Sequence, residues 1–363
     1  MGNILDVLSL DCQKCDPEHF RDLRLVSKAV NEIIEPWNFS TVTFHFMKEA
    51  KPNHVPELLK HIISGTSPHV RWAEELQIRD MLPTPADGWL EYNPWRGEER
   101  RMMLASQKED LVSAIRSLIR VERVQFEVSS GESYMDPLCA IAELPRLRDL
   151  ELGFWNSFNF NDAQVPLARF SELRSVKLRN LVPTPAIVKG LERLITNSPS
   201  MSQITIICVP FDPDVEGDND RQHWLDLSSL FEAALAPVNT PSFSEQTVQN
   251  TAPLSLSIEN LAVAGMQILS PTAVPYLRSL TSLTIFNNSV QIDSLFWNAL
   301  KTSEVHLRRL TVYLILQPII DYLLSYDGLQ DIKISTAAAY AQFYLMAGQN
   351  GHGLSPSHIF EVF

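Results

Sequence analysis

The chain has 363 residues, of which 45% are hydrophobic and 20% are charged, so it can bury a large core over two domains or one extended solenoid. Its 30 basic and 43 acidic residues give a net charge of −13, which argues against binding nucleic acid through phosphate contacts. The sequence contains no glycine-rich phosphate loop and no nucleophile-elbow motif, and no other group of residues predicts an enzyme.

The cysteines and the apolar runs bear on where the protein resides. Four cysteines cannot staple a chain of this length, which indicates a reducing compartment. The N-terminal run MGNILDVLSLDCQ lacks the basic start of a secretory signal. No apolar run approaches the ~18 residues that span a bilayer. We therefore expect a protein of the cytoplasm or nucleus that has no membrane partner.

Residues 16–46 predict a helix followed by a strand. Asp16 and Pro17 are typical of a helix start, and Pro36 is expected to end the helix. One face of this helix carries apolar residues at spacings of three and four, namely Phe20, Leu23, Val26, Val30 and Ile33. After it, Val42, Phe44 and Phe46 alternate with polar residues, as in a half-buried strand. As structure alone, this segment predicts a helical cap for whatever follows.

A short pattern recurs along the rest of the chain: an apolar residue, two free positions, an apolar residue, one free position and a last apolar residue. The last position of each clear copy is Phe126, Leu152, Leu178, Ile206, Ile285, Val312 or Ile334, and two weaker copies end at Ile78 and Val263. Most successive copies lie 22 to 28 residues apart, which is the period of a leucine-rich repeat. Two longer steps, of 48 and 57 residues, indicate insertions or decayed copies.

The pattern also predicts secondary structure, because alternate side chains of a strand face the same way. Leu150 and Leu152 therefore point together into a core. Helical spacings lie between the strands in three sets: Leu111, Ile115, Leu118 and Ile119; Ile187, Leu191, Leu194 and Ile195; Ile319, Ile320, Leu323 and Leu324. Strands that alternate with helices must be parallel, so the predicted fold is an α/β solenoid of irregular leucine-rich repeats. We expect this solenoid over 47–363, after a small helical unit at 1–46, with loop insertions near 83–101 and 210–253.

Two motifs carry a resemblance to a known family. The run 16–44, DPEHFRDLRLVSKAVNEIIEPWNFSTVTF, resembles the latter two-thirds of an F-box through Asp16, Pro17, Leu23, Leu25, Val26, Ser27, Lys28, Asn31, Pro36, Val42, Thr43 and Phe44. The fullest repeat reads Leu280-x-x-Leu283-x-Ile285-x-x-Asn288-x-Val290. Together they resemble the F-box/leucine-rich-repeat proteins that are abundant in mushroom-forming fungi. The chain departs from that family at its opening helix, where Asn3–Leu8 replaces the usual Leu-Pro start.

The resemblance implies a non-enzymatic subunit that recognises substrates for a cullin-RING ubiquitin ligase of the SCF type. In that family the F-box helices bind the linker subunit, which joins them to the cullin, and the solenoid binds a protein substrate. The resemblance places linker contacts at Pro17, Leu23, Leu25, Val26 and Lys28. The alternative is a leucine-rich-repeat scaffold with no ubiquitin role, whose N-terminal helices serve only as a cap.

The free positions of the pattern predict the substrate surface, because they face away from the core on a row of parallel strands. Phe286 and Tyr313 follow two neighbouring strands, with Arg309 nearby, and exposed aromatic residues beside Arg are enriched in interface hot spots. Lys177 and Arg179 occupy the same columns and complete the predicted substrate-binding set. The alternative is that the two rings pack on each other or beneath the insertion at 237–253.

Two segments have some of the residues that hold metals. Cys12 and Cys15 form a CxxC motif, but a structural zinc site needs four ligands and no second pair lies nearby. The Asp-rich run 212–220 resembles a calcium loop, but His223 stands where a bidentate Glu is required. We therefore expect neither a metal nor another cofactor. Further along, the apolar run Ala337–Met346 predicts a helix that covers the last repeat.

Overall fold

The computed structural model describes residues 28–46, 54–79, 94–128, 134–154, 165–208, 224–235, 256–265, 267–286 and 290–334. The chain divides into two compact units, Met1–Ala163 and Gln164–Phe363. The helix start expected at Asp16 lies outside the described residues, and so does the run expected to cover the last repeat.

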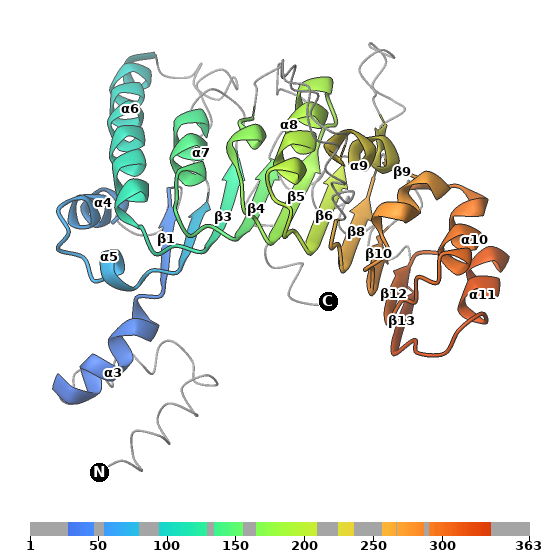
Figure 1. Cartoon of the computed structure of the whole chain (residues 1–363). Coiled ribbons are helices and arrows are strands. Elements are labelled where there is room, and N and C mark those ends of the chain that lie inside the picture. The colour runs from blue at the N-terminus through green and yellow to red at the C-terminus, as the bar shows by residue number, and fades with distance from the viewer. Residues whose placement is uncertain are drawn as a thin grey trace, which may run out of the picture. The chain divides into compact units, whose positions relative to one another are not determined.

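The first unit alternates helices with parallel strands. Its elements are α3 (Lys28–Asn38), β1 (Thr41–His45), α4 (Val55–Ile63), α5 (His69–Trp72), β2 (Glu75–Arg79), α6 (Pro94–Ser117), β3 (Arg123–Val128), α7 (Met135–Ala142) and β4 (Asp149–Phe154). The four strands pair in chain order, each parallel to the next. Helix α6 packs against both α4 and α7, so the helices form a row of their own beside the strands (Figure 1).

The second unit follows the same plan. It contains η5 (Leu167–Arg169), β5 (Ser175–Leu181), α8 (Pro185–Thr196), β6 (Gln203–Cys208), β7 (Leu225–Asp226), α9 (Leu227–Leu235), β8 (Asn260–Ala264), β9 (Gln267–Leu269), η7 (Pro271–Tyr276), β10 (Ser282–Ile285), β11 (Gln291–Ile292), α10 (Ser294–Thr302), β12 (Arg309–Val312), α11 (Gln317–Leu323) and β13 (Asp331–Ile334). Strands β5, β6, β8, β10, β12 and β13 pair in that order, all parallel. A second small sheet pairs β11, β9 and β7.

The recurring apolar pattern coincides with the strands, as the sequence predicts. In β4 both Leu150 and Leu152 are buried, while Glu151 between them is only half-buried and faces the other way. The same holds for the two weaker copies, because Ile78 lies in β2 and Val263 in β8 and both are buried. The prediction of parallel strands alternating with helices is therefore confirmed in each unit.

Several helix boundaries differ from the sequence prediction. Pro36 lies inside α3, which runs on to Asn38, since a proline near the last turn removes only one backbone hydrogen bond. Helix α6 begins at Pro94, so part of the loop expected near 83–101 is helical; proline is well suited to a first helical turn. The apolar stripe of α6 ends before Ile119, whose side chain is 57% exposed because the helix stops at Ser117.

Strand β1 belongs to the sheet and does not form part of a separate N-terminal unit. Thr41 pairs with Glu75 of β2, and the parallel register continues to His45 and Arg79. Val42 and Phe44, which the sequence predicts to face a core, are both buried. A boundary after residue 46 would therefore cut between two hydrogen-bonded strands of one sheet.

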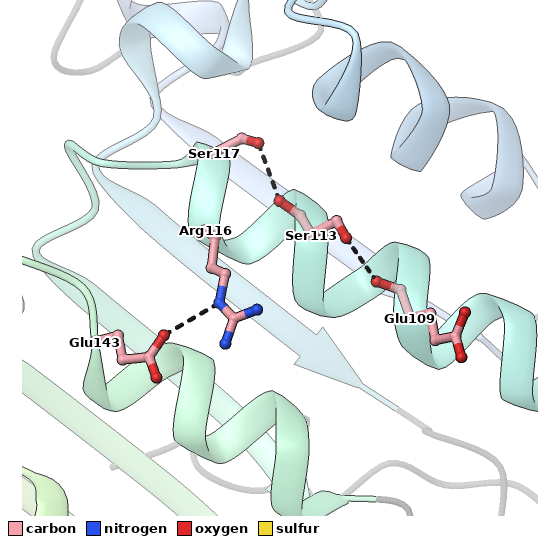
Figure 2. A network of polar contacts seen from close by, with 5 residues as sticks. All are labelled: Glu109, Ser113, Arg116, Ser117 and Glu143. Carbon is pink, nitrogen blue, oxygen red and sulfur yellow. Dashed lines mark hydrogen bonds and ion pairs between the residues drawn. The ribbon is translucent and has the colours of Figure 1, made fainter.

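A polar network on the surface of the first unit joins α6 to α7 (Figure 2). Arg116 Nε donates to Glu143 Oε2 at 3.1 Å, and both side chains are more than half exposed. Within α6, Ser113 Oγ donates to the Glu109 carbonyl and Ser117 Oγ donates to the Ser113 carbonyl, each at 3.0 Å. Such exposed contacts contribute little to stability on their own.

One turn in the second unit requires glycine. Gly265 follows β8 with φ +83°, and a Cβ atom there would lie 2.2 Å from the Cys208 carbonyl oxygen. The buried Gln267 fills the space beside this turn and donates from Nε2 to the carbonyls of Ile206 and Ala264, each at 2.7 Å. The side-chain amide of Gln267 thus provides hydrogen bonds to two backbone carbonyls at the point where the chain passes from β8 to β9 of the small sheet.

Candidate protein-recognition face

The side chains between the buried apolar pairs form a second face on each row of strands, which we call the polar strand face. In the first unit it comprises Thr41, Thr43, Glu75, Gln77, Arg123, Gln125, Asp149 and Glu151. In the second unit it comprises Ser175, Lys177, Gln203, Thr205, Asn260, Ala262, Ser282, Thr284, Arg309, Thr311, Asp331 and Lys333. Most of these side chains are half-buried, because neighbours on adjacent strands pack against each other.

In the first unit, side chains of the polar strand face contact one another within and between strands. Arg123 Nη2 lies 3.4 Å from Glu75 Oε2, and these residues are direct partners in the register of β2 and β3. Gln77 Nε2 donates to Glu75 Oε1 at 2.6 Å. These contacts align charged and amide groups across neighbouring strands.

In the second unit an arginine spans three strands. Arg309 of β12 is paired in register with Ser282 of β10, and its Nη2 reaches beyond that strand to Asn260 Oδ1 at 3.0 Å. On the last strand, Lys333 Nζ lies 3.3 Å from Asp331 Oδ2. Arg309 is nonetheless exposed, so its guanidinium is fixed in place and still accessible to a partner.

The predicted substrate residues fall into two separate groups. Phe286 and Tyr313 directly follow β10 and β12 and are half-buried, whereas Arg309 is the first residue of β12 and lies at the other end of that strand. Lys177 and Arg179 lie on β5, where they face Thr205 and Ile207 of β6. Strands β6 and β8 separate β5 from β10, which places the two groups roughly 14 Å apart at the usual strand spacing. Arg179 is also buried, and therefore a poor contact for a partner.

The two aromatic rings do not stack on each other. Among the described aromatic side chains, ring contacts join Trp297 to Tyr322 and Tyr322 to Tyr326, but none joins Phe286 to Tyr313. The backbone amide of Phe286 donates to the Val263 carbonyl at 3.0 Å, which fixes the position from which its ring projects. Both residues thus remain candidate anchors on the edge where these strands end.

Of the predicted linker contacts, only Lys28 lies in the described part of the chain. It begins α3 and is exposed, whereas Pro17, Leu23, Leu25 and Val26 lie outside that part.

Helix α3 also exposes a residue that sequence reasoning missed. Trp37 is 46% exposed, while Ile34 one turn earlier is buried. The sequence did contain a signal for Trp37: it stands four residues after Ile33, so it continues the apolar stripe of the helix past Pro36.

Within the first unit, a histidine of α5 contacts Phe39, which follows the end of α3. His69 Nδ1 donates to the Phe39 carbonyl at 3.2 Å, and the two rings meet edge to face with centroids 5.0 Å apart. Burial lowers the pKa of His69 and outweighs the opposing effect of that hydrogen bond. The ring is therefore neutral near pH 7 and carries its proton on Nδ1.

The described residues also include a buried cysteine thiol, Cys208. Burial raises the pKa of the Cys208 thiol to about 12, so it is protonated and a poor nucleophile at neutral pH. No group of three His, Cys, Asp or Glu residues is placed to hold a metal ion within the described ranges. None of the helices in those ranges is both long and apolar enough to cross a bilayer. Comparison of the whole chain with protein-family models finds no match, and comparison with curated proteins finds none.

Proposed function

We propose that this protein is a non-enzymatic recognition subunit that presents a leucine-rich-repeat solenoid to a protein partner. The observation that carries the proposal is the polar strand face of the second unit, where Arg309 is anchored by Asn260 yet accessible. Phe286 and Tyr313 follow the last residues of β10 and β12, at the opposite end of these strands from Arg309. Aromatic and arginine side chains are those on which protein interfaces most depend.

The resemblance of residues 16–44 to an F-box makes the ubiquitin system the proposed setting. In this role the N-terminal helices bind the linker subunit of an SCF-type ligase, and the strand face binds the substrate to be modified. The apolar stripe of α3 supports the proposal, since Trp37 extends it onto an exposed surface. A partly exposed apolar helix face is what a partner helix packs against.

A second candidate function has its own observation. Because β1 pairs with β2, the helix before it stands at the start of a continuous sheet, as a cap would. A scaffold that binds proteins without any ubiquitin ligase accounts for this arrangement equally well. The two candidates differ in one property, which is binding of the linker subunit.

Capture of the linker subunit tests the choice between them. The first variant removes residues 1–27, which deletes Pro17, Leu23, Leu25 and Val26 and leaves every described element intact. The second is the full chain with Leu23→Ala and Val26→Ala. Both should lose linker and cullin in an affinity pull-down while their thermal unfolding stays that of the wild type. Deletion to residue 46 is unsuitable because it would remove β1 from the sheet.

A matched pair of tryptophans serves as the control. Trp37→Ala on α3 should weaken linker capture, whereas Trp224→Ala in the second unit should not, although both side chains are at least one-third exposed. Linker capture by the variant that lacks residues 1–27 would show that the F-box assignment is wrong. Failure of the wild-type chain to capture the linker would favour the scaffold.

A separate variant tests the strand face. Phe286→Ala with Tyr313→Ala should remove capture of a protein substrate and leave linker binding and thermal stability nearly unchanged. Arg179→Gln is the comparison on the same face, because its side chain is buried and distant from the aromatic pair. A large loss of stability with substrate capture intact would assign the two rings to the core instead.

A further inference from the structure

The last strand of the second unit exposes apolar side chains whose counterparts on the strand before it are buried. In β12, Leu310 and Val312 are buried, whereas their register partners in β13, Ile332 and Ile334, are 43% and 56% exposed. Paired residues of neighbouring strands face the same side of a sheet, so both isoleucines project on the side where the core of the second unit lies. Their exposure therefore reflects a neighbouring element that the described residues do not supply.

Helix α11 carries a second apolar stripe beside the one that it buries. Leu316, Ile320 and Leu324 stand four residues apart, from the N-cap to the C-cap of this helix, and each is more than one-third exposed. Tyr322 is buried and contacts Trp297 of α10, with ring centroids 5.7 Å apart. Residues two positions apart point to different sides of a helix, so the exposed stripe faces away from α10.

This stripe and the two isoleucines lie on the last helix and the last strand of the second unit's row (Figure 1). Exposed apolar surface of this extent is typical of an interaction site. We call it the end face; it comprises Leu316, Ile320, Leu324, Ile332 and Ile334.

The backbone of β13 adds an open sheet edge to the end face. Among the described strands, β13 pairs only with β12. The Asp331 amide donates to the Arg308 carbonyl at 3.1 Å, so the amide of Ile332, one residue further on, points away from β12. An edge with N–H and C=O groups of this kind is a template for pairing with another strand.

The charges on the other face of β13 indicate which strand fits this edge. Asp331 and Lys333 project on the polar strand face, where Lys333 Nζ lies 3.3 Å from Asp331 Oδ2. A lysine alone on an edge strand opposes pairing with another strand. A second β13 that runs antiparallel and is centred on Ile332 removes this obstacle, because it places its own Asp331 opposite Lys333 and its own Lys333 opposite Asp331. Opposite charges at facing positions stabilise a pair of strands.

Other registers of the same two strands are disfavoured. A shift of one residue sets apolar side chains opposite charged ones. A shift of two residues sets Asp331 opposite Asp331 of the second copy, or Lys333 opposite Lys333, and like charges at facing positions are destabilising. In the centred register the two Ile332 residues face each other, and their outward amides and carbonyls can exchange both hydrogen bonds. The sequence of β13 is thus complementary to itself in one register.

We propose that the end face binds a second copy of this chain, in a twofold dimer that pairs β13 with β13 and α11 with α11. The twofold axis of two antiparallel strands is perpendicular to their sheet, so both α11 helices lie on the same side and their exposed stripes meet. The polar strand faces of the two second units also point to one side. The dimer therefore offers two recognition faces to a partner that has two epitopes.

The proposed interface is small, because it consists of one pair of four-residue strands and one pair of short helices. A dimer of this size should dissociate on dilution. In dilute solution the chain is then a monomer whose end face meets solvent. The inference is independent of the ubiquitin-ligase proposal.

Sedimentation equilibrium of the full chain over a range of concentrations tests this inference. The wild type should pass reversibly from monomer to dimer as its concentration rises. Lys333→Asp and Asp331→Lys should each weaken dimerisation by about tenfold or more, because each sets like charges opposite each other twice in the interface. Both substitutions in one chain should restore the dimer, since the charges are exchanged but stay complementary. An equimolar mixture of the two single variants should form mixed dimers, because all facing charges are then opposite.

A matched pair of leucines tests the contribution of the helices. Leu324→Glu should prevent dimerisation, because it introduces a charge into the stripe of α11. Leu295→Glu is the control, since Leu295 is 60% exposed on α10 and lies outside the end face. All variants should keep the wild-type unfolding temperature in dilute solution, because the substituted side chains are exposed.

A wild-type chain that stays monomeric at every concentration would overturn the proposal and would leave the end face to a segment outside the described residues. A dimer that survives both Lys333→Asp and Leu324→Glu would also overturn it, since that dimer would form through another surface. The same conclusion would follow if the exchange of both charges in one chain did not restore the dimer.

Discussion

The first and last strands show how the same sequence pattern leads to different burial. In β1 and β2, Val42 and Ile78 occupy apolar positions of the pattern and are both buried. In β13, Ile332 and Ile334 occupy those positions and are 43% and 56% exposed. The pattern predicts the strand in both regions, but it does not by itself place a side chain in a core.

The difference follows from what comes after each strand. In the first unit the segment that follows β1 forms α4, which buries Val55, Leu59 and Ile62 beside the strands. Within the described residues no element follows β13. The preceding helix is affected as well, because Leu324 just after α11 is 81% exposed. Burial of an apolar pair on a strand thus depends on the connection that follows it.

The largest expected effect comes from truncating equivalent isoleucines in these two regions. Ile78→Ala should cost about 2–5 kcal/mol of unfolding free energy, because it leaves a cavity in a packed core. Ile334→Ala should cost less than about 1 kcal/mol, because its side chain already meets solvent. Urea unfolding of both variants measures the comparison. Equal losses would mean that Ile334 is covered in solution, by a segment outside the described residues or by a second copy.

A hydrogen bond gives the end of the second unit a different support. Tyr322 of α11 is buried, and its hydroxyl donates to the Val305 carbonyl at 2.6 Å and accepts from the Leu307 amide at 3.3 Å. Tyr322→Phe should therefore cost about 1–3 kcal/mol, since two buried backbone groups lose their partner. Tyr313→Phe is the control, because that residue is half-buried and near the edge. Similar losses in both variants would contradict the assignment.

Acid should weaken the first unit through His69. Burial holds its folded pKa below the ordinary value of 6.5, so the unfolded chain binds more protons below that pH. The stabilising contribution is complete above pH 6.5 and is lost as the pH falls through the folded pKa. His69→Asn keeps a donor near the Phe39 carbonyl but cannot titrate. Between pH 7 and pH 5 the unfolding temperature of the His69→Asn variant should therefore fall less than that of the wild type, as measured by thermal unfolding at a series of pH values.

The smallest effect is expected for the exposed ion pair between α6 and α7 (Figure 2). A double-mutant cycle with Arg116→Gln and Glu143→Gln should give a coupling of about 0.2–1 kcal/mol, because water screens both groups. The coupling should shrink as salt is added. A salt-independent coupling above that range would show that the pair is more shielded than its exposure indicates.

The candidate recognition residues illustrate the limits of reading a surface from sequence. The columns of free positions predict that β10 and β12 are neighbours, because the register follows from the repeated spacing, but Phe286 and Tyr313 follow the ends of these strands whereas Arg309 begins β12. They also grouped Lys177 and Arg179 with these three, although two strands intervene. The bond from Arg309 to Asn260 joins residues 49 positions apart, and no local pattern predicts such a contact.

The sequence by itself determined the strands that carry the repeated apolar pattern, their parallel order and the buried face of most of them, because alternation and turn spacing are local properties of the chain. It did not predict the small sheet, nor β7 and α9 within the loop expected near 210–253. Only the tertiary structure decided where Pro36 lies in α3, that β1 joins the sheet, and that the apolar pair of β13 meets solvent. Those outcomes depend on which other segments pack nearby, and packing energy outweighs the weak preferences of single residues.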